Sequence, residues 1–559
     1  MKKKLLRKVL SAGLVLVLAL SLAACGSSSS SDEDTSSAEE TDSSEDASSE
    51  DTSDSSSDIV NIGFSDALSS INPLNMSMSF VDLYASSLSF LPLVAYNSEY
   101  GVDSMIAESI TTEDNLTFHI TIRDDAYWSD GEPITADDVI YTILKISSPE
   151  VANYNFDFSR FLGFEDGTSP SGATEIEGLV KIDDKNLEMI ATSEMSLESF
   201  YNGIATWICI LPQHALEDIA DEDLSTTDWF DNPTVVSGPY IVQDYDLLNY
   251  VSYTANENYF MGTPNISTLN IKIMDGSSLL TSLQSGELDM VHPSTAIPST
   301  DQEALEDLEG YTITYSDNII NEMTFINTST ITDSRVRQAI VLAIDREALV
   351  ESILSGHGEV TDSFICSASP YYNSENDTNS YDPDKAKELL EEAGWDESTV
   401  LTWNVNSGDE SAILAVQIAQ QQLAEVGITV EINTVDLATL QTEAGTEDVD
   451  LTSVQYTITP SDYYVDVQWL VDDIYGSGNW TGGYYNEELD AAIQATQTAV
   501  STDDLQEAYD TMEELLLDQV PMFSLYFQSN PGVVSDRIEN AEMTFYGAFN
   551  NVHEWTIAE

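Results

Sequence analysis

The side chains that most often do chemistry in proteins, histidine, cysteine and carboxylate, form no catalytic pattern in this sequence. Its five histidines are scattered singly, whereas a metal site or a catalytic triad brings histidine close to other ligands or to a nucleophile. No phosphate-binding loop, dinucleotide fingerprint, nucleophile elbow or zinc-binding helix occurs in its required form. Neighbouring carboxylates such as Asp137 and Asp138 are frequent, but among 99 acidic residues they arise by chance. We therefore expect no enzyme, no metal site and no cofactor.

One cysteine has a recognisable chemical role. Cys25 follows Leu-Ala-Ala, and the four residues resemble the cleavage box of bacterial lipoproteins, in which the cysteine thiol is lipidated and becomes the first mature residue. A basic stretch, residues 1–8, and an apolar run, residues 9–20, precede it in the order of a secretory signal peptide. The apolar run is shorter than the about 20 residues of a membrane-spanning helix. We interpret residues 1–25 as a lipoprotein signal peptide that ends in the lipidated Cys25.

The next segment, residues 26–58, contains almost nothing except Ser, Asp, Glu and Thr. Such a composition cannot bury a core, so we expect disorder, and repulsion between the carboxylates favours an extended chain. We interpret 26–58 as an acidic, Ser-rich tether. Because two acyl chains suffice to hold a protein on a bilayer, we expect a protein anchored by lipid alone on the extracytoplasmic face of a bacterial cell membrane, at the cell surface or in the periplasm.

The charge of the remaining chain excludes one class of partner. Five of the 17 Lys and Arg residues lie in the signal peptide, which leaves 12 cations against 99 Asp and Glu residues. A phosphate backbone needs cationic partners, so we expect no binding of nucleic acid. The roughly 500 residues after the tether suffice for two or three domains. Adaptation to salt and repulsion from other acidic polymers are both compatible with this surface charge.

Hydrophobic periodicity predicts a mixture of helices and strands. Apolar residues alternate in the expected strands 117–122, 269–273 and 428–432. Helical spacing with typical end signals is found in the following ranges: 335–354, 382–393, 412–426, 487–499 and 503–517. A helix that runs through Gly427 into a strand is typical of the α/β class. Cys209 and Cys366 follow apolar residues and are expected to be buried thiols, without the spacing of a disulfide.

A series of phrases matches one protein family. Residues 121–139 read as a strand, a turn at Asp130-Gly131 and a helix capped by Thr135. This segment resembles the signature of the oligopeptide- and dipeptide-binding proteins of ATP-driven importers, extracellular solute-binding protein family 5. Further phrases keep the order of the family along the chain: 237–240, 283–289, 333–347, 381–387, 393–395, 427–428, 486–490 and 520–523. We identify the chain as a member of this family from these phrases.

The resemblance implies an α/β protein with the type II periplasmic-binding-protein fold, which has two lobes with mixed sheets on crossing segments and, in addition, an extra third domain. By analogy, lobe I combines residues 59–94, 237–316 and 520–559. The extra domain II is expected at 95–236, and lobe II (domain III) at 317–519. The ligand is expected between the lobes, which close over it.

The resemblance also implies ligand-binding residues. In peptide-binding relatives an aspartate in a Trp-x-x-Asp-Tyr phrase receives the α-ammonium group of the peptide, whose backbone pairs like an added strand. Residues 459–463 match this phrase, which implies that role for Asp462, although Thr459 stands where the family has tryptophan. The other pocket residues that the resemblance implies are Tyr463, Tyr464, Trp469, Ser79, Phe80, His292 and Ser294. The segments matched to the pocket contain no Lys or Arg, so they offer no partner for a peptide carboxylate.

We therefore expect a monomeric substrate-binding lipoprotein that captures short peptides and delivers them to the permease and ATPase subunits of an ABC importer. Two alternatives keep the fold. The ligand could be an oligosaccharide, which the aromatic residues near Asp462 and the missing tryptophan favour, or the protein could be a peptide sensor without transport. An enzyme that acts on a surface polymer lacks any supporting motif, and the few scattered histidines disfavour a nickel or haem carrier.

Overall fold

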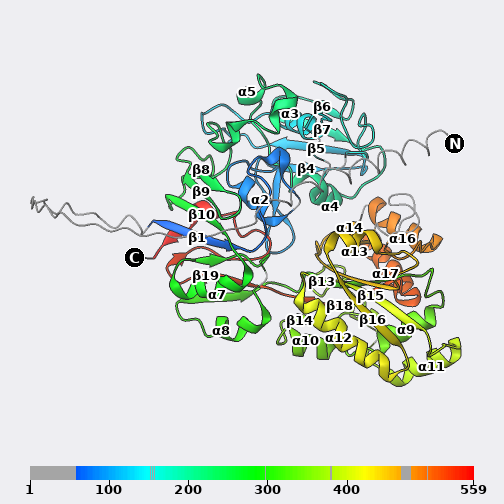
Figure 1. Ribbon diagram of the computed structural model, residues 1–559. Coiled ribbons are helices and arrows are strands. Elements are labelled where there is room, and N and C mark those ends of the chain that lie inside the picture. Colours follow the sequence, from blue (N-terminus) through cyan, green and yellow to red (C-terminus); the bar gives the residue numbers. More distant parts are fainter. Residues whose placement is uncertain are drawn as a thin grey trace, which may run out of the picture. The chain divides into compact units, whose positions relative to one another are not determined.

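The computed structural model describes residues 58–558, apart from 78, 152, 154, 157, 296, 378–379, 468–479 and 500. The expected signal peptide, the lipid anchor Cys25 and nearly all of the expected tether lie outside these residues, as does Trp469. In the part of the chain that is described, no helix has both the length and the apolar character needed to cross a bilayer. Helices alternate with strands throughout this part, as expected for the α/β class (Figure 1).

The first large sheet has seven strands and mixes parallel with antiparallel pairs, in the order β12-β19-β11-β1-β10-β9-β8. At its centre β1 pairs in parallel with β10, so that Ile62 lies opposite Ile271. Both residues are fully buried, which fixes the register of the pair. The strands are β1 (Ile59–Phe64), β8 (Tyr240–Asp246), β9 (Tyr250–Ala255), β10 (Thr268–Ile273), β11 (Met290–Val291), β12 (Tyr311–Tyr315) and β19 (Pro531–Ser535). The associated helices are α2 (Phe80–Ser87), α7 (Gly276–Ser285) and α8 (Gln302–Glu306), and a small ladder joins β20 (Ile538–Glu539) to β21 (Thr556–Ile557).

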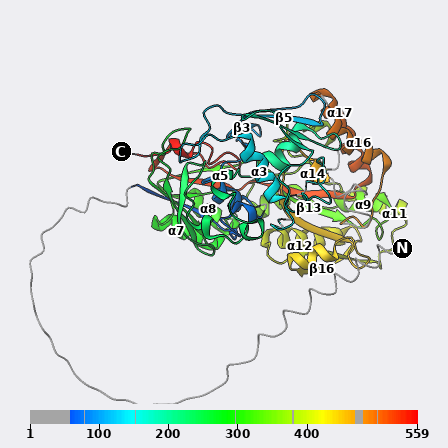
Figure 2. The same cartoon turned by 90° about the horizontal axis from the view of Figure 1, so that it is seen from above.

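The second large sheet has six strands in the order β14-β18-β13-β17-β15-β16. Its strands are β13 (Ile320–Ile326), β14 (Gly358–Glu359), β15 (Val400–Asn406), β16 (Thr429–Val435), β17 (Leu451–Thr457) and β18 (Met522–Gln528). Its helices are α9 (Ser334–Leu342), α10 (Arg346–Ile353), α11 (Pro383–Ala393), α12 (Glu410–Glu425), α13 (Leu437–Glu443), α14 (Tyr464–Val467), α16 (Glu487–Thr498) and α17 (Thr502–Gln519). The helix α12 packs along β15 and β16, and α16 lies against α17 (Figure 2).

The expected long helix 335–354 is two helices in the structure. The helix α9 ends at Leu342, and α10 begins at Arg346. Asp345 caps the second helix, because its carboxylate accepts a hydrogen bond from the Ala348 N–H at 3.0 Å. The expected helices 382–393, 412–426, 487–499 and 503–517 correspond to α11, α12, α16 and α17 with ends shifted by one or two residues.

The chain crosses between the two large sheets twice. It leaves the first sheet after β12 and enters the second with β13 at Ile320. The return occurs between Gln528 and Pro531, because β18 pairs with β13 whereas β19 pairs with β11 and β12. The expected boundary at residue 520 therefore lies too early: β18 belongs to the second sheet, and the last segment joins the first sheet from β19 onward.

A third sheet, β4-β5-β7-β6, lies within residues 95–236. It consists of β4 (Ala107–Thr111), β5 (Thr117–Ile122), β6 (Leu179–Lys181) and β7 (Asn186–Ile190). The accompanying helices are α3 (Ala136–Ile146), α4 (Leu197–Phe200), α5 (Gln213–Leu216) and α6 (Asp221–Leu224), and a one-turn π-helix, η2 (Tyr201–Ala205), follows α4 directly. The hairpin β2 (Val94–Tyr96) and β3 (Val102–Ser104) precedes this sheet.

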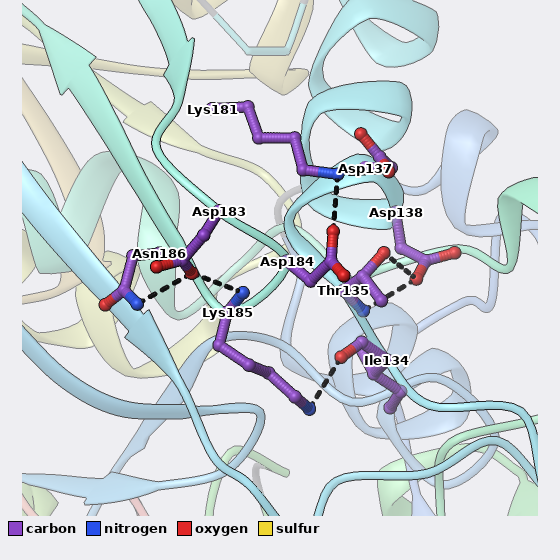
Figure 3. A network of polar contacts seen from close by, with 9 residues as sticks. All are labelled: Ile134, Thr135, Asp137, Asp138, Lys181, Asp183, Asp184, Lys185 and Asn186. Carbon is purple, nitrogen blue, oxygen red and sulfur yellow. Dashed lines mark hydrogen bonds and ion pairs between the residues drawn. The ribbon is translucent and has the colours of Figure 1, made fainter.

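Polar contacts fix the signature-like segment 121–139 in place (Figure 3). As predicted, Thr135 precedes α3, and the Asp138 carboxylate accepts hydrogen bonds from the Thr135 N–H and hydroxyl. The Lys185 ammonium donates to the Ile134 carbonyl at 2.9 Å, and Lys181 pairs with Asp137 at 2.7 Å (Figure 3). The two lysine contacts hold the start of α3 against the β6–β7 hairpin. The segment is therefore a structural element of the third sheet.

Candidate ligand-binding site

An aromatic cavity lies where segments from all three sheets meet. It encloses about 60 Å³ and is lined mainly by apolar side chains. The lining residues are Phe80, Leu83, Tyr84, Ser87, Leu88, Leu91, Pro92, Ala95, Tyr96, Met105, Asn202, Thr206, Trp207, Pro239, Tyr259, Thr459, Tyr546, Gly547, Phe549 and Asn550. None of these residues is a lysine, an arginine or a carboxylate. The wall therefore offers apolar and aromatic contacts together with a few neutral polar groups.

Phe80 is the centre of the aromatic wall. It begins α2, and its ring lies 5.6 Å from Trp207, 4.9 Å from Phe545 and 5.6 Å from Tyr546, measured between ring centroids. The edge-to-face geometry with Phe545 and Tyr546 is the arrangement that aromatic rings prefer. Phe80 comes from the N-terminal segment and Tyr546 from the C-terminal one. The wall thus forms only when the two ends of the folded body lie together.

Asp462 lies beside this cavity and is almost completely buried, with 2% of its surface exposed. It follows a turn in which its own N–H donates to the Thr459 carbonyl at 2.9 Å. Its carboxylate accepts hydrogen bonds from the Ser199 hydroxyl at 3.1 Å, the Tyr464 N–H at 3.2 Å and the Asn202 amide at 3.5 Å. These three donors are neutral. Burial raises the pKa of Asp462, while its hydrogen bonds and the Arg160 charge act in the opposite direction.

Asn202 connects Asp462 to the cavity. It belongs to the π-helix η2, a rare element that is frequent at functional sites. Its amide lines the cavity, contacts Asp462, and accepts a hydrogen bond from the Thr459 hydroxyl at 3.4 Å. Thr459, which replaces the tryptophan of the family phrase, also lines the cavity. The phrase 459–463 thus reaches the cavity through its first residue.

A second carboxylate approaches the same place. Glu198 is half-buried on α4, and burial followed by repulsion from Asp462 raises its pKa. The buried Tyr96 side chain lies close enough to both carboxylates to feel their charge. Burial raises the pKa of Tyr96, and the charges of Asp462 and Glu198 raise it further. The polar side of the site therefore gathers three acidic side chains, those of Asp462, Glu198 and Tyr96.

Two of the expected pocket residues have other roles in the structure. Tyr463 is fully buried in the core beside the second sheet, where its hydroxyl accepts a hydrogen bond from the Cys366 N–H at 3.2 Å. Tyr464 is buried at the start of α14, and the Arg160 guanidinium lies 5.3 Å from the centre of its ring. Neither residue lines the cavity. Cys366 and Cys209 are buried free thiols, as expected for the two residues.

The expected pocket residues next to the first sheet lie in the wall of the cavity or behind it. Phe80 lines the cavity, whereas Ser79 caps α2 through a hydrogen bond from the Asp82 N–H at 3.3 Å. His292 is fully buried, with its ring 4.7 Å from Tyr84, a wall residue. Its Nδ1 accepts a hydrogen bond from the Ser294 N–H at 3.0 Å, and burial lowers the pKa of His292 to about 3. His292 and Ser294 thus support the wall from behind as neutral groups.

Several wall residues were not predicted from the sequence. Trp207 stands in an apolar run that reads as core, and Tyr546 and Phe549 lie in a C-terminal segment that carries no matched phrase. One local signal marks the latter segment: Gly547 has a φ of 82°, and an added Cβ would lie 3.0 Å from the Asn97 Cα atom. A glycine between aromatic residues thus indicates a close backbone approach.

The comparisons with known proteins define the class to which this fold and site belong. The family model of the bacterial extracellular solute-binding proteins, family 5, matches residues 101–479. The chain belongs to this family. It is 24% identical over 498 residues to the oligopeptide-binding protein AppA of Bacillus subtilis. The aligned region covers 84% of this chain and 86% of AppA.

Solved structures share the fold along nearly the whole chain. The ABC transporter substrate-binding protein CtaP of Listeria monocytogenes superposes with a TM-score of 0.75 at 22% identity, covering 90% of this chain and 99% of CtaP. AppA of Bacillus subtilis, solved in complex with a nonapeptide, gives a TM-score of 0.69 at 21% identity, with 90% and 99% coverage. These likenesses confirm the expected two-lobed binding-protein fold.

Proposed function

We propose that this protein captures peptides through their free amino terminus and delivers them to an ABC importer. The observation that carries this proposal is the buried Asp462 carboxylate, which lies beside an aromatic cavity and has only neutral hydrogen-bond donors. A buried carboxylate whose direct hydrogen-bond donors are all neutral favours a cationic guest, because the guest gives the carboxylate a charged partner in direct contact. The relatives named above include oligopeptide-binding proteins, which supports a peptide as that guest.

The cavity accounts for the side chains that such a peptide would present. Phe80, Trp207 and Tyr546 offer ring faces and edges to an apolar or aromatic residue. A cavity of about 60 Å³ is much smaller than a peptide. Peptide entry therefore requires the parts around the cavity to separate, and binding closes them again.

The cellular context belongs to the same proposal. We place the signal peptide at residues 1–25, the lipid on Cys25 and the tether at 26–58, so that the binding domain is held at the extracytoplasmic face of the membrane. We keep the proposed division into lobe I, domain II (95–236) and lobe II, with the return to lobe I after Gln528. The permease and ATPase subunits of an importer are the proposed partners of a monomeric binding protein.

Calorimetric titration of the soluble fragment from residue 59 tests the proposal. The titrants are a mixed pool of tri- to octapeptides, the same pool after N-acetylation, and cello- and xylo-oligosaccharides. We expect heat of binding from the free peptides and its loss after acetylation, because acetylation removes the ammonium group that Asp462 receives. Binding of oligosaccharides alone would contradict a peptide ligand and leave the fold assignment unchanged. Equal binding of free and acetylated peptides would contradict the role of Asp462.

A further inference from the structure

A series of hydrogen bonds, half-buried at Arg160 and buried at its other end, runs from domain II into lobe II and ends on Asp462. The Gln497 side-chain oxygen accepts hydrogen bonds from the Arg160 guanidinium at 3.2 and 3.3 Å. The Gln497 amide nitrogen donates to the Ser199 hydroxyl at 3.0 Å, and that hydroxyl donates to the Asp462 carboxylate at 3.1 Å. The path therefore alternates between the two parts: Arg160 and Ser199 belong to residues 95–236, whereas Gln497 and Asp462 belong to residues 317–519.

The donor and acceptor roles in this series follow from the chemistry of its ends. A guanidinium has donors only, so the Gln497 oxygen must face Arg160. The amide nitrogen then faces Ser199, and a hydroxyl that accepts from an amide keeps its own hydrogen for the carboxylate. An ionised carboxylate can only accept hydrogen bonds, so Asp462 accepts the last bond of the series. Every hydrogen bond of the series is therefore donated in the same direction, from Arg160 towards Asp462.

The surrounding contacts strengthen this junction. Gln497, Ser199 and Asp462 are each at least nine-tenths buried, with 1%, 8% and 2% of their surface exposed. Asn115, in the turn between β4 and β5, donates to the backbone carbonyls of Gln497 at 3.4 Å and Ala499 at 3.1 Å. Breaking the junction would expose these groups to water together, and leaving one of them buried without its partner would be costly.

We propose that Arg160, Gln497 and Ser199 form a latch that holds domain II against lobe II and so keeps the binding site closed, even without a ligand. The latch gives domain II a direct part in closure, because the hydroxyl that seals the junction is also a donor to Asp462. It rests on the proposed function in one respect: the ammonium group at Asp462 would strengthen a junction that is already formed. Ser199 and Gln497 are positioning residues, since they act on the ligand through Asp462.

The test measures closure directly, by pulsed electron paramagnetic resonance between two spin labels. One label is placed at Glu165→Cys in domain II and the other at Glu447→Cys in lobe II, since both positions are exposed. The labelled protein is the fragment from residue 59, which does not contain Cys25, and the native Cys209 and Cys366 are buried and do not compete for the label. The distance distribution is recorded for the labelled protein, for Gln497→Ala and Ser199→Ala in the same background, and for Gln421→Ala as a control. Gln421 is an exposed glutamine of lobe II whose amide contacts only its own helix, at the Gln417 carbonyl.

Without ligand, we expect a populated short distance in the labelled protein and in Gln421→Ala. In Gln497→Ala and Ser199→Ala, the ratio of closed to open protein should fall by about five- to tenfold, the scale of one or two neutral buried hydrogen bonds. Circular dichroism of each variant verifies that it is folded. The latch is overturned if the ligand-free protein shows no closed population, or if both variants close as the control does.

Addition of the peptide pool separates this proposal from the proposed function. If peptides bind at Asp462, the pool should restore part of the closed population in Gln497→Ala. If the pool binds no variant, the peptide function fails, while a shift of the ligand-free ratio still supports the latch. A closed population that rises when the pool is added, combined with a ligand-free ratio that the variants leave unchanged, supports peptide binding and overturns the latch.

Discussion

Ser199 donates a hydrogen bond to Asp462 across 263 residues of sequence, and this contact joins α4, which follows the third sheet, to the turn after β17 of the second sheet. Ser199 lies on α4, next to the π-helix that carries Asn202, so that one short stretch of domain II supplies two of the donors to the carboxylate. The carboxylate is thus oriented by a part of the chain that does not belong to its own lobe. Its availability to a ligand depends on how the two parts are placed.

Replacement of Asp462 by asparagine should abolish most of the affinity for free-amino peptides. The change keeps the size of the side chain and removes the charge that balances the ammonium group. We expect a loss of ~2–5 kcal/mol in the free energy of binding, the scale of removing one partner of a buried charge pair. Calorimetry with the peptide pool measures this loss. Asp448→Asn, at an exposed position of the same lobe, should bind as the unchanged protein does, and equal affinity of both variants would contradict the assignment.

The fold could be predicted from the sequence further than the site could. The phrases that identify the family, such as 121–139, are local patterns of turns and caps, and the structure has the predicted strand, turn and helix there. The single helix expected at 335–354 was wrong because Asp345, which reads as one more polar helix residue, caps a new helix. The boundary at residue 520 was wrong because strand pairing joins residues 200 positions apart, which no local pattern records.

Sequence phrases lead to some residues at the cavity, whereas residues that only tertiary contacts bring there carry no local signal. Asp462 and Phe80 come from matched segments, and both lie at the cavity or beside it. Tyr463 is adjacent to Asp462 but points into the core, because neighbouring residues in a turn face different directions. Tyr546 and Trp207 meet Phe80 only through the packing of distant segments. Their roles follow from contacts between residues hundreds of positions apart. The spacing of residues along the sequence does not indicate such contacts.

The charge of the protein should make its stability depend strongly on salt. The chain carries a formal net charge of −82, and acidic groups far outnumber the cations that could neutralise them. Salt shortens the range of repulsion between carboxylates, from about 10 Å at 0.1 M to about 3 Å at 1 M. We expect the thermal midpoint of unfolding to rise by several degrees between 0.05 and 1 M NaCl. Scanning calorimetry of the fragment from residue 59 measures the midpoint, and a midpoint that is constant or falls would show that repulsion does not limit stability.

Glu513 should make the stability of the protein decrease with rising pH. Its side chain is fully buried on α17, and desolvation raises its pKa to about 7, against the effect of hydrogen bonds from Ser363 and Asn376. A carboxyl whose pKa is higher in the folded than in the unfolded protein binds its proton more tightly when folded. Its contribution to stability is therefore complete below the unfolded pKa and is lost as pH rises through about 7.

The variant Glu513→Gln should remove this part of the pH dependence. Between about pH 4.5 and 7.5 we expect the free energy of unfolding of the unchanged protein to fall by roughly 2–3 kcal/mol more than that of the variant. Urea unfolding at a series of pH values provides the two curves. Glu507→Gln, at an exposed position of the same helix, serves as the control and should follow the unchanged protein. Parallel curves for Glu513→Gln and the unchanged protein would show that Glu513 is ionised throughout.

The close approach at Gly547 should make the wall of the cavity sensitive to a single methyl group. Gly547 has a φ of 82°, and a Cβ atom would lie 3.0 Å from the Asn97 Cα and 3.2 Å from the Ser98 nitrogen. Gly172 has a similar φ of 67°, but an added Cβ meets nothing within 4 Å. Both substitutions by alanine carry the cost of a left-handed backbone, about 1–2 kcal/mol. Only Gly547→Ala adds a backbone clash.

We therefore expect Gly547→Ala to lower the free energy of unfolding more than Gly172→Ala does, by an additional ~1–3 kcal/mol, the usual scale of overpacking. It should also weaken binding of the peptide pool, because Gly547 lines the cavity between Tyr546 and Phe549. Gly172→Ala should leave binding unchanged. Urea unfolding and calorimetry measure the two effects. If both variants lose the same stability, the segments around Asn97 and Gly547 can move apart at little cost, and the wall is less rigid than its contacts indicate.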